Sequence, residues 1–138
     1  MIRSLGLYSV LSLCLLAGCA TSPANVAGAG TQLETRQIQT RVYDTLDKAM
    51  TMRSVIATLQ DLGFTIDQAD SELGTVTATR LHEYTMRMTV TVVERDGRRI
   101  SVRTNARIGE NSVTDANTYQ DFFVALDKAM FLTLHKVD

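Results

Sequence analysis

Two stretches of alternating apolar and polar residues, on either side of Asp96-Gly97, constrain the fold of this chain more than any other feature. The apolar positions are Tyr84, Met86, Met88, Val90 and Val92 in the first stretch, and Ile100, Val102, Ala106 and Ile108 in the second. A period of two predicts strands with one buried face, and Asp-Gly between them predicts a tight turn. The chain must therefore contain an antiparallel hairpin that covers a core with one of its faces.

The length of the hairpin loop decides which residues are paired. A two-residue loop, Asp96-Gly97, would set apolar side chains against polar ones along both strands. A three-residue loop over 95–97, with the glycine in the left-handed conformation, pairs Val92 with Ile100 and keeps the two apolar faces together. We therefore predict the three-residue loop.

A helix that ends at Gly63 is predicted before these strands. Its apolar residues recur at helical spacing: Met52, Val55, Ile56 and Leu59. Asp44, Thr45 or Asp47 can accept hydrogen bonds from the first turn as the N-cap, and Gly63 stands where a left-handed C-cap belongs. Phe64 is then placed to fold back onto the end of the helix.

Shorter alternating stretches predict three further strands. The first precedes the helix and has one face formed by Ile38, Thr40 and Val42. Two more follow the helix, one around Ile66 and one around Ala78, with turn-forming residues over 67–74 between them.

A long second helix is predicted after a polar loop over 109–114. Asp115 is its expected N-cap, and its apolar residues follow the spacing of one helix face: Tyr119, Phe122, Phe123, Leu126, Met130, Thr133, Leu134 and Val137. Alternating strands favour a sheet with one wet and one covered face. We predict a two-layer α+β domain in the order β-α-β-β-β-β-α, in which a four-stranded antiparallel meander and a short N-terminal strand carry both helices on one face.

The N-terminal segment has the features of a secretory signal peptide. A short start containing Arg3 precedes about a dozen mostly apolar residues, fewer than the roughly 20 that a membrane span needs. The run ends in Leu16-Ala17-Gly18-Cys19, which resembles the lipobox of bacterial lipoproteins. This resemblance implies that residues 1–18 are removed and that acyl chains on Cys19 attach the protein to a membrane. A signal peptide cleaved without acylation is the alternative.

The rest of the chain divides into a tether, residues 19–35 with the lipidated cysteine, and a single periplasmic α+β domain, residues 36–138. The tether is rich in Ala, Gly, Ser and Thr and has no apolar period. As a flexible coil it would hold the domain on the order of 20 Å from the membrane. The chain has 14 Lys and Arg, of which Arg3 belongs to the signal, against 15 Asp and Glu. This balance gives no support for binding nucleic acid.

The sequence contains no recognisable catalytic or metal-binding motif. His82 and His135 have no ligand partners at suitable spacing, and Asp67, Asp70 and Glu72 lack the order and closing Glu of a calcium loop. Acidic residues are common in turns, which is the preferred interpretation of this group. We therefore expect a protein that is not an enzyme and has no cofactor, no catalytic residues and no metal site.

The outward face of the predicted hairpin carries the candidate binding residues. Arg87 on one strand and Arg99, Arg103 and Arg107 on the next share that face with hydroxyl and amide side chains: Thr85, Thr89, Thr91, Ser101 and Asn105. Solvated sheet faces often have this composition. The alternative is a docking face for an acidic partner, for which the forked donors of arginine are suited.

The chain from Cys19 onward resembles a group of small lipoproteins of Gram-negative bacteria. The resemblance is carried by residues 55–64 (VIATLQDLGF), by Leu73-Gly74-Thr75-Val76 and by residues 119–123 (YQDFF). More distantly, the helix ending in Leu62-Gly63-Phe64 and the strand that begins at Gly74 are similar to the helix-grip domains of BamC, a lipoprotein of the outer-membrane protein assembly machinery. Ala20 after the lipobox cysteine implies, by the sorting pattern of lipoproteins, the outer membrane.

These features together predict an outer-membrane lipoprotein that serves as a non-enzymatic accessory or scaffold of an envelope complex, in outer-membrane assembly or trans-envelope efflux. The alternative is a module that binds a small molecule or lipid in a space between sheet and helices. A cavity of several hundred Å³ lined by Met and Tyr would favour the binding module. A filled core beneath a flat arginine-bearing face would favour the scaffold.

Overall fold

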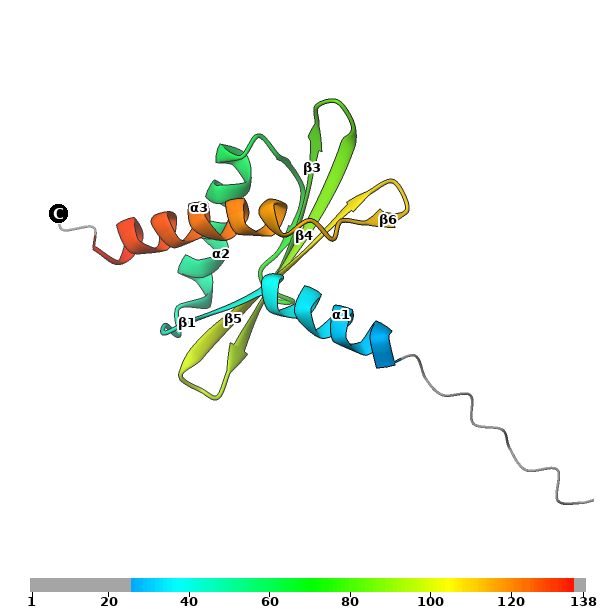
Figure 1. Ribbon diagram of the computed structural model, residues 1–138. Coiled ribbons are helices and arrows are strands. Elements are labelled where there is room, and N and C mark those ends of the chain that lie inside the picture. The colour runs from blue at the N-terminus through cyan, green and yellow to red at the C-terminus, as the bar shows by residue number, and fades with distance from the viewer. Residues whose placement is uncertain (1–25, 136–138) are drawn as a thin grey trace, which may run out of the picture.

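The computed structural model describes residues 26–135, which form helices packed on one antiparallel sheet (Figure 1). The helices are α1 (Val26–Ile38), α2 (Lys48–Asp61) and α3 (Ala116–Leu134). The strands are β1 (Thr40–Tyr43), β2 (Thr65–Asp70), β3 (Thr75–Leu81), β4 (Thr85–Arg95), β5 (Arg99–Ile108) and β6 (Asn111–Ser112). Their order in the sheet is β1-β5-β4-β3-β2, and β6 pairs with the far end of β5.

The α+β class and the antiparallel sheet are as predicted, but two elements were not expected. Helix α1 occupies 26–38, where the sequence predicts a tether up to residue 35 and a strand that includes Ile38. Among the side chains described in this segment, which begin at Gln32, those that pack against or into the core are Ile38 and Gln39, next to β1. An apolar stripe along the helix is therefore missing, and such a stripe is what identifies a helix in sequence. Strand β6 is two residues long, which is too short to show a period.

The two longer helices cover one face of the sheet. After β1 at one edge, α2 crosses to β2 at the opposite edge, and β3, β4 and β5 then return by successive antiparallel pairing to β1. Helices α2 and α3 cross each other on the same side of the sheet (Figure 1). The chain thus forms the predicted two layers, with the opposite face of the sheet open.

The register of the central hairpin differs from the prediction by two residues. Val92 pairs with Val102 instead of Ile100, and Arg95 pairs with Arg99 across the loop 96–98. The loop has three residues, as predicted, but begins one residue later because Asp96 and Gly97 both adopt positive φ, at 60° and 61°. Two consecutive left-handed residues are typical of the primed turns that match strand twist. A shift of two leaves every side chain on its predicted face.

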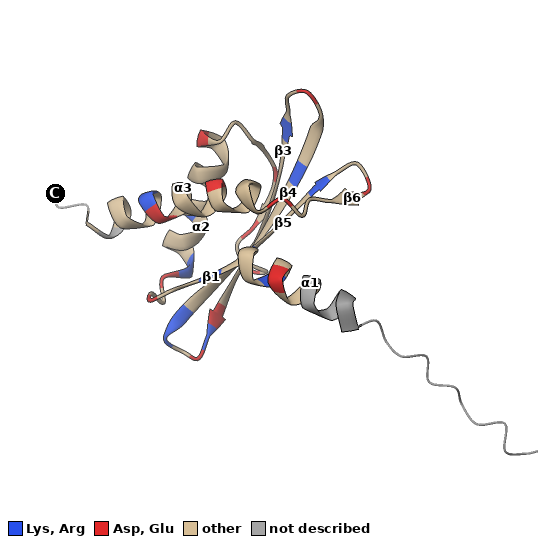
Figure 2. Ribbon diagram, viewed as in Figure 1, with Lys and Arg blue, Asp and Glu red and all other residues tan. Residues whose placement is uncertain are grey.

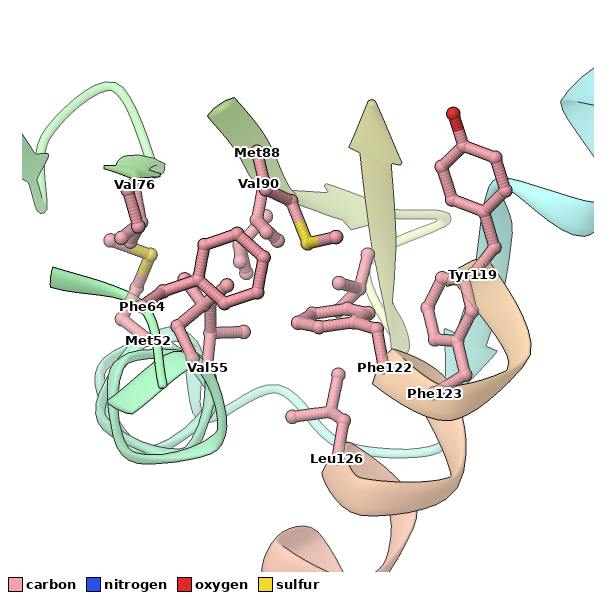
Figure 3. Close-up of a cluster of buried hydrophobic side chains, with 14 of the residues drawn as sticks. Met52, Val55, Phe64, Val76, Met88, Val90, Tyr119, Phe122, Phe123 and Leu126 are labelled. Carbon is pink, nitrogen blue, oxygen red and sulfur yellow. The ribbon is translucent and has the colours of Figure 1, made fainter. Parts of the chain in front are cut away.

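The core lies between α2, α3 and the inner face of the sheet (Figure 3). Val55 and Leu59 of α2, together with Phe122 and Leu126 of α3, are fully buried. From the sheet, most of the predicted inward-facing residues contribute the other side: Val76, Ala78, Met86, Met88, Val90, Val92, Ile100, Val102 and Ala106. Of the other predicted positions, Ile108 is partly buried and Tyr84, which precedes β4, is exposed. The rings of Phe122 and Phe123 meet edge to face at 5.2 Å. On α3, the predicted core residue Thr133 is exposed, and Val137 lies outside the described residues.

Both ends of α2 and the start of α3 are capped by the residues that the sequence indicates. Asp47 accepts a hydrogen bond from the Met50 amide at 2.8 Å, and Asp115 caps α3 in the same way. At the end of α2, Gly63 has a φ of 81° and the Phe64 amide donates to the Leu59 carbonyl at 2.9 Å. This is the left-handed termination that returns a side chain to the helix, and Phe64 is buried there.

No helix of the described residues is long and apolar enough to cross a membrane. The predicted signal peptide, Cys19 and the first part of the predicted tether lie outside the described residues, which begin at Val26.

Candidate functional site

The open face of the sheet is a mostly polar surface on which hydroxyl groups and arginines are arranged in rows. Arg87 of β4 lies opposite Arg107 of β5, Thr89 opposite Asn105, and Thr91 opposite Arg103. The rows continue onto β3, where Thr75, Thr77 and Thr79 pair with Thr91, Thr89 and Arg87. The structure therefore brings the four predicted arginines onto one face, and Figure 2 shows basic segments along β4 and β5 with acidic segments in the turns at their ends.

The four arginines differ in their ionic partners. Arg99 makes an ion pair with Asp96 in the adjacent turn, and Arg107 contacts the Glu110 carboxylate at 3.3 Å and its carbonyl at 2.7 Å. Among the residues that the structure describes, Arg87 and Arg103 contact no carboxylate. The face thus contains two arginines with local counter-charges and two whose guanidinium groups are left to solvent.

A shallow depression of about 420 Å³ lies at the end of the face where β4 and β5 carry Arg87 and Arg107. Thr85 and Thr89 line it together with the turn residues Gly109 and Glu110. Like charges directly opposite each other in a sheet repel. The Glu110 carboxylate relieves this repulsion at Arg107, so Arg87 is the cation of this depression that remains without a counter-charge.

A second pocket, of about 360 Å³, lies where α1 approaches β5 and β6. Its cations are Arg36 from α1 and Arg103 from β5, and Asn105 and Ser112 also line it. Sequence reasoning missed Arg36 because this residue falls where the tether was predicted to meet the first strand. No local pattern shows that residue 36 lies near residue 103, since only the pairing of β1 with β5 brings them together.

In the described part of the chain, the central core side chains are packed without exposed surface. Leu59, Val90, Tyr119 and Phe122 have no surface that a water molecule can reach, and Met88 has almost none. A cavity of several hundred Å³ would expose the side chains that line it. The methionines therefore fill the core. Two buried hydroxyls, of Thr58 and Thr104, have no hydrogen-bond partner within the described part of the chain.

A polar cluster fastens the edge strand β1 to α3. The Tyr43 hydroxyl donates to Asp127 at 2.8 Å, and Arg41 pairs with the same carboxylate. The Arg41 guanidinium also lies 4.8 Å from the centre of the Phe123 ring. Burial, followed by the hydrogen bond to Asp127 and its negative charge, raises the pKa of Tyr43 far above its usual range. The cluster has the features of a structural clamp, because these groups satisfy one another.

The acidic residues of the predicted turn also serve local structure. Asp67 accepts a hydrogen bond from the Thr79 hydroxyl at 2.6 Å, and Asp70 accepts one from the Leu73 amide at 2.8 Å. The Glu72 carbonyl binds the Lys48 ammonium group at 2.9 Å. In the described part of the chain, no group of three or more His, Cys, Asp or Glu side chains is placed to hold a metal ion.

The two histidines lie apart from this face. His135 follows α3, where its ring stacks on Phe131 at 4.1 Å and its Nδ1 lies 2.9 Å from the Phe131 carbonyl oxygen. His82 is an exposed residue of the β3–β4 turn. Within residues 26–135, neither imidazole makes an ion pair with a carboxylate.

Comparison with known proteins adds no relative: no family model and no curated protein matches this chain. The functional interpretation therefore depends on the sequence features and on the geometry of the exposed face.

Proposed function

We propose that this protein is a periplasm-facing lipoprotein of the outer membrane, held by acyl chains on Cys19, and that it acts as a non-enzymatic scaffold or accessory of an envelope complex. Outer-membrane assembly and trans-envelope efflux are the two kinds of complex that the proposal includes. The resemblance to Gram-negative lipoproteins and to the helix-grip domains of BamC supports this location. The proposal assigns the contact with the partner to the open face of the sheet.

The observation that carries the docking proposal is the state of Arg87 and Arg103. Both are exposed on a hydroxyl-rich face, and neither contacts a carboxylate among the described residues. A guanidinium group presents forked donors that match a carboxylate, and a partner that supplies one gains a charge-assisted hydrogen bond. An acidic protein surface is therefore the partner that fits this face.

The filled interior supports a scaffold over the alternative of a ligand-binding module. A binding module would need a space between sheet and helices, whereas the central core side chains have no accessible surface. The chain therefore offers partners its surface rather than an internal cavity.

The proposal is tested by photo-crosslinking in intact cells, with the crosslinker placed at Thr89. This residue lies on the open face between the rows that contain Arg87 and Arg103. The double variant Arg87→Gln/Arg103→Gln should lose the crosslinked product. Its stability should change by no more than about 0.5 kcal/mol per substitution, because both side chains are exposed.

A double variant with the same change in charge provides the control. Arg99→Gln/Arg107→Gln alters the two arginines of this face that already contact Asp96 and Glu110. We expect this variant to keep most of the crosslinked product. Wild-type crosslinking in the first variant, or equal loss in both, would contradict the assignment to Arg87 and Arg103.

A further inference from the structure

The pocket between α1, β5 and β6 has the composition of an anion site. Arg36 and Gln39 line it from the end of α1 and the residue that follows, Arg103 and Asn105 from β5, and Ser112 and Thr114 from β6 and the connection to α3. Among the described residues that line this pocket of about 360 Å³, none is acidic. Cations and neutral hydrogen-bonding groups thus line an open pocket, and no carboxylate of the described residues lines it with them.

The two cations reach the pocket from different elements. Neither Arg36 nor Arg103 makes an ion pair with any residue that the structure describes. Arg36 lies in the last turn of α1, where a positive charge suits the negative end of the helix dipole. That role explains Arg36 alone, since Arg103 belongs to a strand. Two unpaired guanidinium groups lining one pocket are better explained by a shared anionic ligand.

Hydrogen bonds hold the backbone beneath one side of the pocket, at Gln39. Gln39 is buried, its side-chain Nε2 donates to the Tyr119 hydroxyl at 3.1 Å, and its backbone carbonyl accepts from the Thr104 amide at 2.8 Å. These bonds tie the end of α1 to β5 and to α3. The segments that carry Arg36 and Arg103 are therefore in place before a ligand binds, and only the two exposed arginine side chains have to be ordered.

We infer that this pocket binds a phosphate group. Donors from three separate segments line this open pocket, and the oxygens of a tetrahedral phosphate point in several directions, whereas the two oxygens of a carboxylate lie in one plane. The volume falls at the small end of the range for ligand sites, so it admits a phosphate and part of the group that carries it. A lipid headgroup and a soluble phosphate ester share this chemistry.

Titration of the full-length protein with inorganic phosphate, at constant ionic strength, tests this inference. The NMR signal of the Asn105 side-chain amide should shift in a saturable way. Arg36→Gln should weaken the apparent affinity about tenfold or more, as loss of one charge-assisted hydrogen bond predicts. Arg87→Gln, the same substitution on the open face but outside this pocket, should leave the affinity unchanged. A shift that does not saturate, wild-type affinity in Arg36→Gln, or equal weakening in both variants would overturn the inference.

Two further samples distinguish the source of the phosphate. The first sample contains the protein in nanodiscs of phosphatidylglycerol without added phosphate. If the Asn105 signal has its phosphate-bound position there, and loses it in Arg36→Gln, the ligand is a lipid headgroup. If the signal appears only when glycerol 3-phosphate is added, a soluble ester is the ligand. The phosphate site and the proposed docking face share Arg103. Their tests can still fail separately, because Arg36→Gln should not alter crosslinking from Thr89, and Arg87→Gln should not alter phosphate binding.

Discussion

The hydroxyl group of Tyr119 helps to close the part of the β5 edge that no strand covers. Strand β5 pairs with β1 at one end and with β6 at the other, and between them the Thr104 amide donates to the Gln39 carbonyl at 2.8 Å and the Val113 amide to the Ala106 carbonyl at 2.9 Å. The hydroxyl accepts from the Ala106 amide at 3.3 Å and from Gln39 Nε2 at 3.1 Å, and donates to the Val113 carbonyl at 2.5 Å. Figure 3 shows that it points away from the apolar cluster to which its ring belongs. One residue thus joins β5, the end of α1 and the chain before α3.

Replacement of this hydroxyl should therefore cost more than a surface hydroxyl does. Tyr119→Phe keeps the buried ring but leaves buried polar groups without partners, so we expect unfolding free energy to fall by about 1–3 kcal/mol in chemical denaturation. Tyr84→Phe is the matched control, because Tyr84 is 49% exposed and its hydroxyl has no partner in the described part of the chain. Its effect should stay within about 0.5 kcal/mol. Equal stability of the two variants would show that the Tyr119 hydroxyl contributes nothing beyond the ring.

The residue scale also shows what the sequence could and could not predict. Burial of the Tyr119 ring follows from its place in a helical apolar series, and the shared face of Arg87 and Arg103 follows from strand alternation. The partners of Tyr119 could not be predicted, because Gln39 is 80 residues away in the chain. Likewise, Arg36 is recognised as a pocket residue only once β1 is known to pair with β5. In β4 and β5, periodicity indicates which face a side chain occupies, but not which segments meet there. In the short strand β1 it does not give even the face, because Val42 of the predicted apolar set is exposed and Tyr43 packs against the core.

For the central hairpin, the sequence predicts the faces of the two strands correctly but not the pairing between them. A register shift by one residue would exchange the inward and outward faces of the hairpin, whereas a shift by two would not. The pattern of apolar residues therefore determines the faces strongly. The choice between Ile100 and Val102 as the partner of Val92 depends on the conformation of the turn. The positive φ of Asp96 starts the turn one residue later, which pairs Val92 with Val102. Both alternatives bury similar side chains, so the pattern of apolar residues could not distinguish them.

The attachment of the short strand β1 to α3 should depend on pH. The pKa of Tyr43 is raised above its ordinary value of about 10, mainly by burial and then by Asp127, so the folded state holds this proton more tightly than the unfolded state. Below about pH 10 the Tyr43 hydroxyl is protonated in both states, and its contribution to the free energy of unfolding is complete. As the pH rises further, the unfolded state loses the proton first, and this contribution is lost. We expect Tyr43→Phe to be less stable than wild type near neutral pH, and the difference to narrow above about pH 10. Urea denaturation of both proteins along a pH series measures this, and parallel curves would contradict the assignment.

At the scale of the whole molecule, α1 sets how the domain would be presented to a membrane. Helix α1 projects from the sheet away from α2 and from the C-terminal half of α3 (Figure 1). Its last turns line the pocket that also contains Arg103 and Asn105 of the open face. A chain anchored through Cys19 would therefore present the proposed docking face and the phosphate pocket on the side from which α1 enters. The layer of helices would contribute stability, and the open face of the sheet would make the contacts with partners.

Attachment to the membrane through Cys19 is predicted from the resemblance of Leu16-Ala17-Gly18-Cys19 to a lipobox. Acylation of Cys19 requires its thiol, and each buried methylene of an acyl chain adds about 0.8 kcal/mol to membrane binding, so several chains should hold the protein almost permanently. Cys19→Ser should abolish labelling by an alkyne-bearing palmitate analogue and release the processed domain from the outer-membrane fraction, or leave the precursor uncleaved. Cys14→Ser changes the other cysteine of the chain and should keep both the label and the location. If Cys19→Ser is still labelled and still sediments with the outer membrane, or if the wild type takes up no label, the lipoprotein assignment is wrong, and the domain must reach its partners without an anchor.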